Sequence, residues 1–273
     1  MESTQPLFGK TILNTRGKSA AAGFSKKILA AGGTPIEIPL LTFQKPKDTM
    51  IIEETIKNLH MYEWLIFTSK NGVDSFFEFY NLVVEKVTKN IPMPKIAVVG
   101  TKTEKALLAK GYTPELVPDE FIAEGLFESL RPYVKSGVHF LLARGNLSRS
   151  YLVDELTKHG AVATDLIVYE TVGDSRERDQ LIKLLKEKRI DIITFTSPST
   201  VKQFYKMVEQ TEWEEWTDHV LFACIGPETK KAADHLHIPI HICPRNYTTD
   251  FLLAEIIDFL HKKENNDGEI TIC

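Results

Sequence analysis

The sequence has few cysteines, no excess of basic residues and no long apolar run. Its three cysteines, Cys224, Cys243 and Cys273, form no C-x-x-C pair and are odd in number. Neither a disulfide framework nor a structural zinc site is therefore expected. With 33 basic against 37 acidic residues, the chain has no general positive field to hold a nucleic acid. No stretch approaches the roughly 18 apolar residues of a membrane-spanning helix, so no membrane span is expected.

Signatures of several common enzymes are missing as well. G-x-G-x-x-G, G-x-x-x-x-G-K-[ST], G-x-S-x-G and H-E-x-x-H do not occur, which removes the main support for nucleotide, hydrolase and zinc-protease functions. His235, His237 and His241 lie near a predicted short strand, where alternation explains their spacing without a metal. Residues 1–10 have neither the basic nor the apolar segment of a secretory signal, so we expect a cytoplasmic protein.

Short apolar, β-branched runs alternate with longer amphipathic stretches along the whole chain. This alternation predicts parallel sheets covered by helices on both faces. The length of 273 residues and the 43% hydrophobic content suit two domains. The predicted strands are residues 11–14, 64–67, 96–99, 140–143, 192–195 and 220–225, and the predicted helices are residues 20–31, 73–84, 103–110, 147–159, 176–188, 200–208 and 250–262.

The two halves of the sequence are similar to each other at a shift of about 128 residues. GKTILNTRG at 9–17 matches GVHFLLARG at 137–145, which places Arg16 on Arg144. The next blocks pair residues 64–76 with 192–204 and, at a shift of about 126, residues 95–126 with 221–252. Any two βα units share some likeness, but three blocks in one order with matched Gly and Pro favour an internal duplication.

Polar residues at helix starts form the candidate binding site. In open parallel sheets, ligands bind beyond the carboxyl ends of the strands, where helix N-termini point N–H groups outward. Ser69 and Ser197 are predicted N-caps, and Thr101 is predicted to open a capping box. Capping alone would explain them. Their recurrence together with Arg16 and Arg144 indicates a common cleft that suits a ligand with several carboxylates.

Seven short motifs in order resemble those of the uroporphyrinogen-III synthases, over about residues 9–260. Each motif is weak alone, but the order and spacing of all seven are specific. They are Thr15-Arg16, Phe67-Thr68-Ser69 with Asn71-Gly72-Val73, Val99-Gly100-Thr101, residues 118–126, Val168-Tyr169-Glu170-Thr171, Phe195-Thr196-Ser197-Pro198 and Ile225-Gly226-Pro227-Glu228-Thr229.

The resemblance implies an α/β fold of two similar parallel-sheet, flavodoxin-like domains joined by a two-stranded extended linker. Phe43 and Tyr169 would occupy similar places in the repeat, one in each crossing. From the residues alone, a boundary near Lys135 is expected instead. The implied division is residues 1–38 and 173–262 for domain 1, 44–167 for domain 2, 39–43 and 168–172 for the hinge crossings, and 263–273 for a mobile tail.

The resemblance also implies a lyase of porphyrin biosynthesis that needs no cofactor and no metal. Hydroxymethylbilane would lose water, its ring D would be inverted through a spiro intermediate, and the macrocycle would close as uroporphyrinogen III. Tyr169 would donate a proton to the departing hydroxyl. Hydroxymethylbilane is the expected partner, with transient contact to the preceding pathway enzyme, and the protein is expected to be a monomer. The implied carboxylate contacts are Arg16, Ser69, Thr101, Thr103, Arg144, Ser197 and Thr229.

Two other functions stay open from the residues alone. A non-catalytic receptor for a polycarboxylate or tetrapyrrole would also have two similar lobes about a hinge. A nucleotide- or sugar-phosphate-dependent enzyme would use the Gly100-Thr101 turn to bind phosphate.

Overall fold

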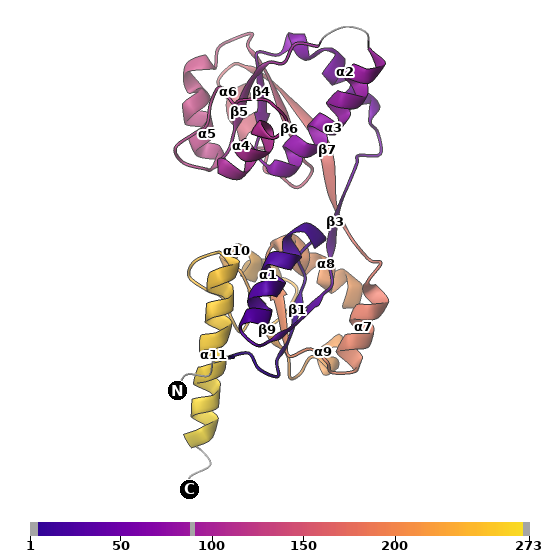
Figure 1. The fold of residues 1–273 in the computed structure, drawn as a ribbon, viewed down its shortest axis with the longest axis vertical. Coiled ribbons are helices and arrows are strands. Elements are labelled where there is room, and N and C mark those ends of the chain that lie inside the picture. Colours follow the sequence, from indigo (N-terminus) through magenta and orange to yellow (C-terminus); the bar gives the residue numbers. More distant parts are fainter. Residues whose placement is uncertain (1–4, 88–90, 270–273) are drawn as a thin grey trace. The chain divides into compact units, whose positions relative to one another are not determined.

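The computed structural model describes residues 5–87 and 91–269, which divide into two compact units (Figure 1). Unit 1 is Met1–Thr42 together with Val172–Cys273, and unit 2 is Phe43–Thr171. Each unit holds one sheet with helices on both of its faces. Within the described part of the chain, no helix is long and apolar enough to cross a membrane.

The sheet of unit 1 has four strands in the order β2-β1-β8-β9, and all three pairings are parallel. Strand β2 is a partly exposed edge strand that contains Pro35, a residue that edge strands tolerate. The strands are β1 (Thr11–Asn14), β2 (Thr34–Glu37), β8 (Ile192–Phe195) and β9 (Leu221–Cys224), and the helices are α1 (Lys18–Ala30), α7 (Arg178–Lys186), α8 (Pro198–Val208), α9 (Trp213–Trp216), α10 (Pro227–Asp234) and α11 (Thr249–Glu269).

Successive side chains of the unit 1 strands enter two different cores. Leu13 and Ile193 pack with α7, α8, α9 and α10 on one face of the sheet. Ile12 and Ile192 pack with α1 and α11 on the other face. Because strand side chains alternate between faces, a strand buried on both sides reads as a continuous apolar run. Helix α11 continues to Glu269, through most of the predicted tail, and residues 270–273 lie outside the described residues.

The sheet of unit 2 has five strands in the order β3-β7-β6-β4-β5. The pairings of β7 with β6, β6 with β4 and β4 with β5 are parallel. The strands are β3 (Leu41–Gln44), β4 (Trp64–Phe67), β5 (Lys95–Val98), β6 (His139–Gly145) and β7 (Val162–Gly173), and the helices are α2 (Met50–Lys57), α3 (Lys70–Lys86), α4 (Thr101–Leu108), α5 (Ala123–Leu130) and α6 (Tyr151–Lys158), with 3-10 turns at Leu59–Met61 and Arg131–Tyr133.

Unit 2 is also built from two apolar layers around its sheet. Leu65 and Phe67 pack against α2, α3 and α4, whereas Trp64 and Ile66 pack against α5 and α6. The predicted α/β class with parallel sheets is therefore confirmed. The helix predicted over residues 147–159 begins only at Tyr151, because residues 146–150 form a turn in which the Ser148 N–H donates to the Gly145 carbonyl (3.1 Å).

Candidate functional site

One serine caps a helix at the carboxyl end of a central strand in each unit. The Ser69 Oγ follows β4 and accepts from the Gly72 N–H at the start of α3 (3.1 Å). The Ser197 Oγ follows β8 and accepts from the Thr200 N–H at the start of α8 (3.2 Å), with Pro198 at the first helical position. Both predicted N-caps are confirmed. Each serine places its hydroxyl at the positive end of a helix.

Glycine, not threonine, caps the second helix start in each unit. Gly100 is the N-cap of α4 and has a φ of 78°, a left-handed conformation that favours glycine. Thr101 is the first helical residue of α4 and is exposed, so the capping box predicted there is wrong. Gly226 is the N-cap of α10, followed by Pro227. No side chain therefore caps the backbone N–H groups at the starts of α4 and α10 among the described residues.

Thr103 and Thr229 occupy the third position of α4 and α10, one in each unit. Each residue is only 3% exposed. Neither hydroxyl has a hydrogen-bond partner among the residues that the structure describes, and no described side-chain oxygen is fully buried without one. Both hydroxyls therefore keep a narrow access to solvent and are free to donate to a ligand.

Tyr169 lies near the carboxyl end of β7 with its ring buried in unit 2. The residue is 9% exposed. Its phenol oxygen lies 3.3 Å from the Oγ of Ser69, across a sequence separation of 100 residues. The Phe43 ring approaches it edge to face, with centroids 5.6 Å apart. The ring is thus held by apolar contact while its hydroxyl lies beside the start of α3, an arrangement typical of a buried tyrosine with a polar partner.

Gly145 makes room for the Tyr169 ring on the neighbouring strand β6. The register between β6 and β7 shifts after Arg144, so that Gly145 pairs with Tyr169. A Cβ at position 145 would lie 2.6 Å from the ring carbon Cε2 and 2.7 Å from the phenol oxygen. Sequence reasoning missed this residue. The only signal was its match with Gly17 in the repeat, which says nothing about a ring packed on it.

The two arginines of the repeat differ in their surroundings. The Nε and Nη2 of Arg144 donate to the Asp165 carboxylate, while Nη1 donates to the carbonyls of Gly145 (3.1 Å) and Ser148 (2.7 Å). Among the described residues, Arg16 in unit 1 makes one side-chain hydrogen bond, from its Nε to the Ala20 carbonyl (3.2 Å). Partial burial lowers the pKa of Arg16 from its ordinary value. Carboxylate binding by Arg144 stays a prediction, and its charge is already matched.

A pocket of about 270 Å³ opens at the carboxyl ends of β4, β5 and β6 in unit 2. Its lining includes Thr68 and Val99, the first residue after β4 and after β5, together with Arg144, Ser148 and Arg149. The Arg149 side chain is 70% exposed and forms an ion pair with Glu124 (3.0 Å). Arg149 was missed from the sequence because it has no partner in the repeat. It supplies a cation where ligands of such sheets bind.

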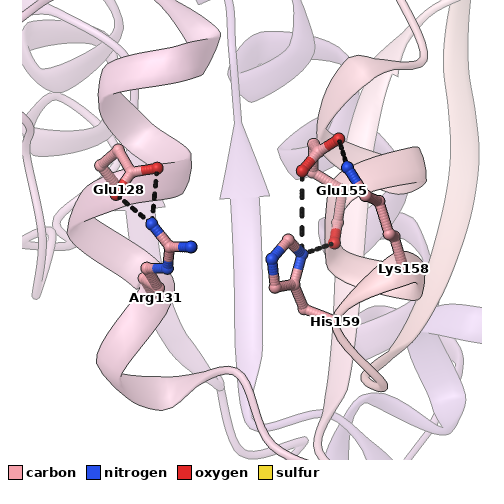
Figure 2. A network of polar contacts seen from close by, with 5 residues as sticks. All are labelled: Glu128, Arg131, Glu155, Lys158 and His159. Atoms are coloured by element: carbon pink, nitrogen blue, oxygen red, sulfur yellow. Dashed lines mark hydrogen bonds and ion pairs between the residues drawn. The ribbon is translucent and has the colours of Figure 1, made fainter.

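Some other charged side chains of unit 2 pair within their own helical turn. Figure 2 shows Arg131 against Glu128 after α5, and Lys158 and His159 against Glu155 at the end of α6. The His159 Nδ1 lies 2.9 Å from the Glu155 carbonyl. Ion pairs within one helical turn on an exposed surface contribute little to stability, about 0.3–0.5 kcal/mol each. None of these five residues lines the pocket at the strand ends.

The fold and these strand-end sites define an α/β protein made of two parallel-sheet units with polar helix starts. Solved structures of that class are similar to it. Against a mutant uroporphyrinogen III synthase from Thermus thermophilus the TM-score is 0.60 at 16% identity, covering 93% of this chain and 100% of that one. Against the enzyme from Helicobacter pylori it is 0.59 at 17% identity, covering 92% and 99%. At these identities the likeness shows the fold alone.

Sequence comparison identifies the family. The family model "Uroporphyrinogen-III synthase HemD" matches residues 22–254. Uroporphyrinogen-III synthase from Synechococcus elongatus is 32% identical over 256 residues, which are 92% of this chain and 96% of that protein. The synthase from Chlorobaculum parvum is 28% identical, over 87% of this chain and 94% of that protein. The chain therefore belongs to the uroporphyrinogen-III synthase family, and the resemblance of its motifs is confirmed.

Proposed function

We propose that this uroporphyrinogen-III synthase cyclises hydroxymethylbilane with inversion of ring D, and that Tyr169 gives a proton to the departing hydroxyl. Family membership supports the reaction. The observation that carries the residue assignment is the Tyr169 phenol oxygen, 3.3 Å from a hydroxyl at the start of α3 and close to the carboxyl edge of the unit 2 sheet. A non-catalytic receptor is not favoured, because the relatives named above are synthases.

The reaction makes modest demands on acid–base chemistry. Hydroxymethylbilane ionises readily to a resonance-stabilised azafulvene, and without an enzyme it closes to the uninverted type I isomer. The protein must therefore favour one closure over another. A hundredfold preference corresponds to about 2.7 kcal/mol of differential transition-state stabilisation, which a few oriented hydrogen bonds can supply. One proton donor and a set of carboxylate contacts are sufficient for this task.

The substrate's carboxylates are proposed to bind at the helix starts of both units. Thr103 and Thr229 support this, because their hydroxyls are free. The side-chain-free N–H groups at the starts of α4 and α10 support it further, since helix N-termini bind anions. Thr101 lies at the start of α4, and Ser197 lies at the start of α8 in unit 1. Arg16 and Arg149 are proposed as the cationic contacts.

An internal duplication is proposed as the origin of the two units. The order β2-β1-β8-β9 of unit 1 corresponds strand by strand to β7-β6-β4-β5 of unit 2. The registers correspond as well, since Ile12 pairs with Ile192 in unit 1 and Phe140 with Trp64 in unit 2. The proposed crossings at residues 39–43 and 168–172 contain the points where the chain passes between the units, after Thr42 and after Thr171.

The proposed reaction is tested by product analysis. Purified protein without added metal or nucleotide should convert hydroxymethylbilane mainly into the type III isomer, resolved from type I by chromatography. Type I in the proportion of an enzyme-free blank would refute the proposal. For the residue assignment, Tyr169→Phe should lower kcat by about tenfold or more with unchanged circular dichroism, because only one hydroxyl is lost. An unchanged kcat would leave Tyr169 as a packing residue.

A further inference from the structure

The contact between Ser69 and Tyr169 is the least expected feature of the proposed site. Sequence reasoning made Ser69 a cap and a carboxylate contact, but its Oγ lies 3.3 Å from the Tyr169 phenol oxygen. The same Oγ accepts from the Gly72 N–H (3.1 Å), which fixes it at the start of α3. The serine hydroxyl therefore contacts both the N-terminus of the 17-residue helix α3 and the proposed proton donor.

The hydrogen-bonding capacity of the two hydroxyls favours one arrangement during the reaction. A serine hydroxyl has one proton and two acceptor lone pairs, and Gly72 already uses one of the lone pairs. When the Ser69 proton points to the Tyr169 oxygen, the phenol proton is free to point away from Ser69. Tyr169 can then donate to another group without losing its contact with Ser69. The opposite arrangement would use the phenol proton on Ser69.

Two further contacts restrict the Tyr169 ring. Phe43 packs edge to face against it, and Gly145 leaves no room for even a methyl group on the side of β6. The ring therefore has little freedom to rotate away from α3. Since packing fixes the ring and the residue is only 9% exposed, the phenol oxygen stays beside Ser69, and the hydrogen bond between the two hydroxyls decides where the phenol proton points.

We propose that Ser69 is a positioning residue for proton transfer: it holds the Tyr169 oxygen, frees the phenol proton for the leaving hydroxyl, and donates to the phenolate that forms. This inference rests on the proposed function of Tyr169. In the step itself, the phenol proton of Tyr169 passes to the oxygen of the substrate's hydroxyl, the C–O bond breaks, and water leaves. The negative charge stays on the phenolate oxygen, and the matching positive charge is delocalised over the azafulvenium that the substrate becomes. The Ser69 O–H and the positive end of α3 both stabilise that charge.

Three single variants test this role. Ser69→Ala removes the donor and the cap, and Ser69→Thr keeps a hydroxyl. Ser197→Ala removes the equivalent cap in unit 1, where no tyrosine among the described residues bonds to the serine. Ser69→Ala should lower kcat by about 5- to 30-fold with KM for hydroxymethylbilane changed less than about twofold. Ser69→Thr should restore most of kcat. The fall in melting temperature of Ser197→Ala measures the loss of a cap, and Ser69→Ala should fall by at least as much, because it also loses the contact with Tyr169.

A double-mutant cycle separates this inference from the proposed function. If Ser69 acts through the Tyr169 hydroxyl, Ser69→Ala should cause no further loss of kcat in a Tyr169→Phe background. An equal loss in both backgrounds would overturn the inference, as would a rise in KM with kcat unchanged, which is the behaviour of a carboxylate contact. If Tyr169→Phe alone keeps full kcat, the failure lies with the proposed role of Tyr169 itself. Wild type that gives only type I isomer would locate the failure in the reaction.

Discussion

Gly145 and Tyr169 pair across β6 and β7 so closely that the tyrosine ring fills the space of a Cβ at position 145. Gly145→Ala should therefore displace the ring, since its methyl would lie 2.6 Å from Cε2. We expect a loss of about 1–3 kcal/mol in the free energy of unfolding, as for other overpacked cores. We also expect a fall in kcat at least as large as that of Tyr169→Phe, because the hydroxyl leaves Ser69.

The control for this variant is Gly23→Ala in the exposed part of α1. A Cβ at Gly23 meets nothing within 4 Å, and alanine is the better helix former by about 0.5–1 kcal/mol. Denaturant unfolding should show this variant at or above wild-type stability with unchanged kcat. Equal stability of Gly145→Ala and wild type would contradict the packing of Tyr169 described above.

Local patterns predicted the central strands well and the irregular segments poorly. β1, β4 and β8 coincide with the predicted runs, because strands buried on both faces read as uninterrupted apolar segments. The edge strand β2 was missed, since it is short, partly exposed and contains Pro35. Helix α6 starts late because Arg144 holds the Ser148 carbonyl in the preceding turn. That contact joins a strand to a turn and leaves no periodic trace in the sequence.

The candidate site was predictable only where it depends on helix starts. Ser69 and Ser197 follow buried strands and precede helices, and this order is visible in the sequence. The matched charge of Arg144 was not visible, because Asp165 meets it only through the pairing of β6 with β7. Contacts between residues far apart in the chain, such as Ser69 with Tyr169, depend on the whole sheet and have no local signature.

Single losses of the proposed hydroxyl donors should be mild and combined losses severe. Thr229→Ala removes one free hydroxyl and leaves the backbone donors of α10 in place. Each hydroxyl contributes about 0.5–1.5 kcal/mol to binding, so Ser197→Ala or Thr229→Ala should cost less than about tenfold in kcat/KM. Combined with Thr103→Ala, the triple variant should lose much more. Steady-state kinetics with hydroxymethylbilane measure both effects. If kcat/KM of the triple variant is no lower than that of the least active single variant, these hydroxyls do not bind the substrate.

Cys224 should be inert toward alkylating reagents in the folded protein. It is fully buried at the end of β9, and burial, with the neighbouring Cys243, raises the pKa of the Cys224 thiol to about 12. A raised pKa means less thiolate, about one part in ten thousand at pH 8, and the thiolate is the reactive form. Iodoacetamide at pH 8, followed by peptide mass analysis, should leave Cys224 unmodified until urea unfolds the chain. Equal labelling rates with and without urea would contradict this burial.

Arg149 offers the sharpest test of the pocket at the ends of β4, β5 and β6, because the same unit contains a matched control. Arg149 pairs with Glu124 at 3.0 Å and lines the pocket. Arg131 pairs with Glu128 at 2.9 Å (Figure 2) and is not among the residues that line the pocket. Both pairs are exposed, so replacing either arginine should change the free energy of unfolding by less than about 1 kcal/mol.

Only Arg149→Ala should affect catalysis, because only its cation lies where a carboxylate of the substrate is proposed to bind. We expect kcat/KM to fall by about 5- to 50-fold, mainly through a rise in KM. A charge-assisted hydrogen bond contributes about 1.5–3 kcal/mol, and screening by solvent reduces this contribution at an exposed site. The difference between wild type and Arg149→Ala should shrink as the salt concentration is raised, because added ions screen the attraction between Arg149 and the substrate carboxylate in wild type. Arg131→Ala should stay within about twofold of wild type at every salt concentration. Equal kinetics of the two variants would show that Arg149 is not a contact of the substrate, and would leave Arg16 in unit 1 as the proposed cationic contact.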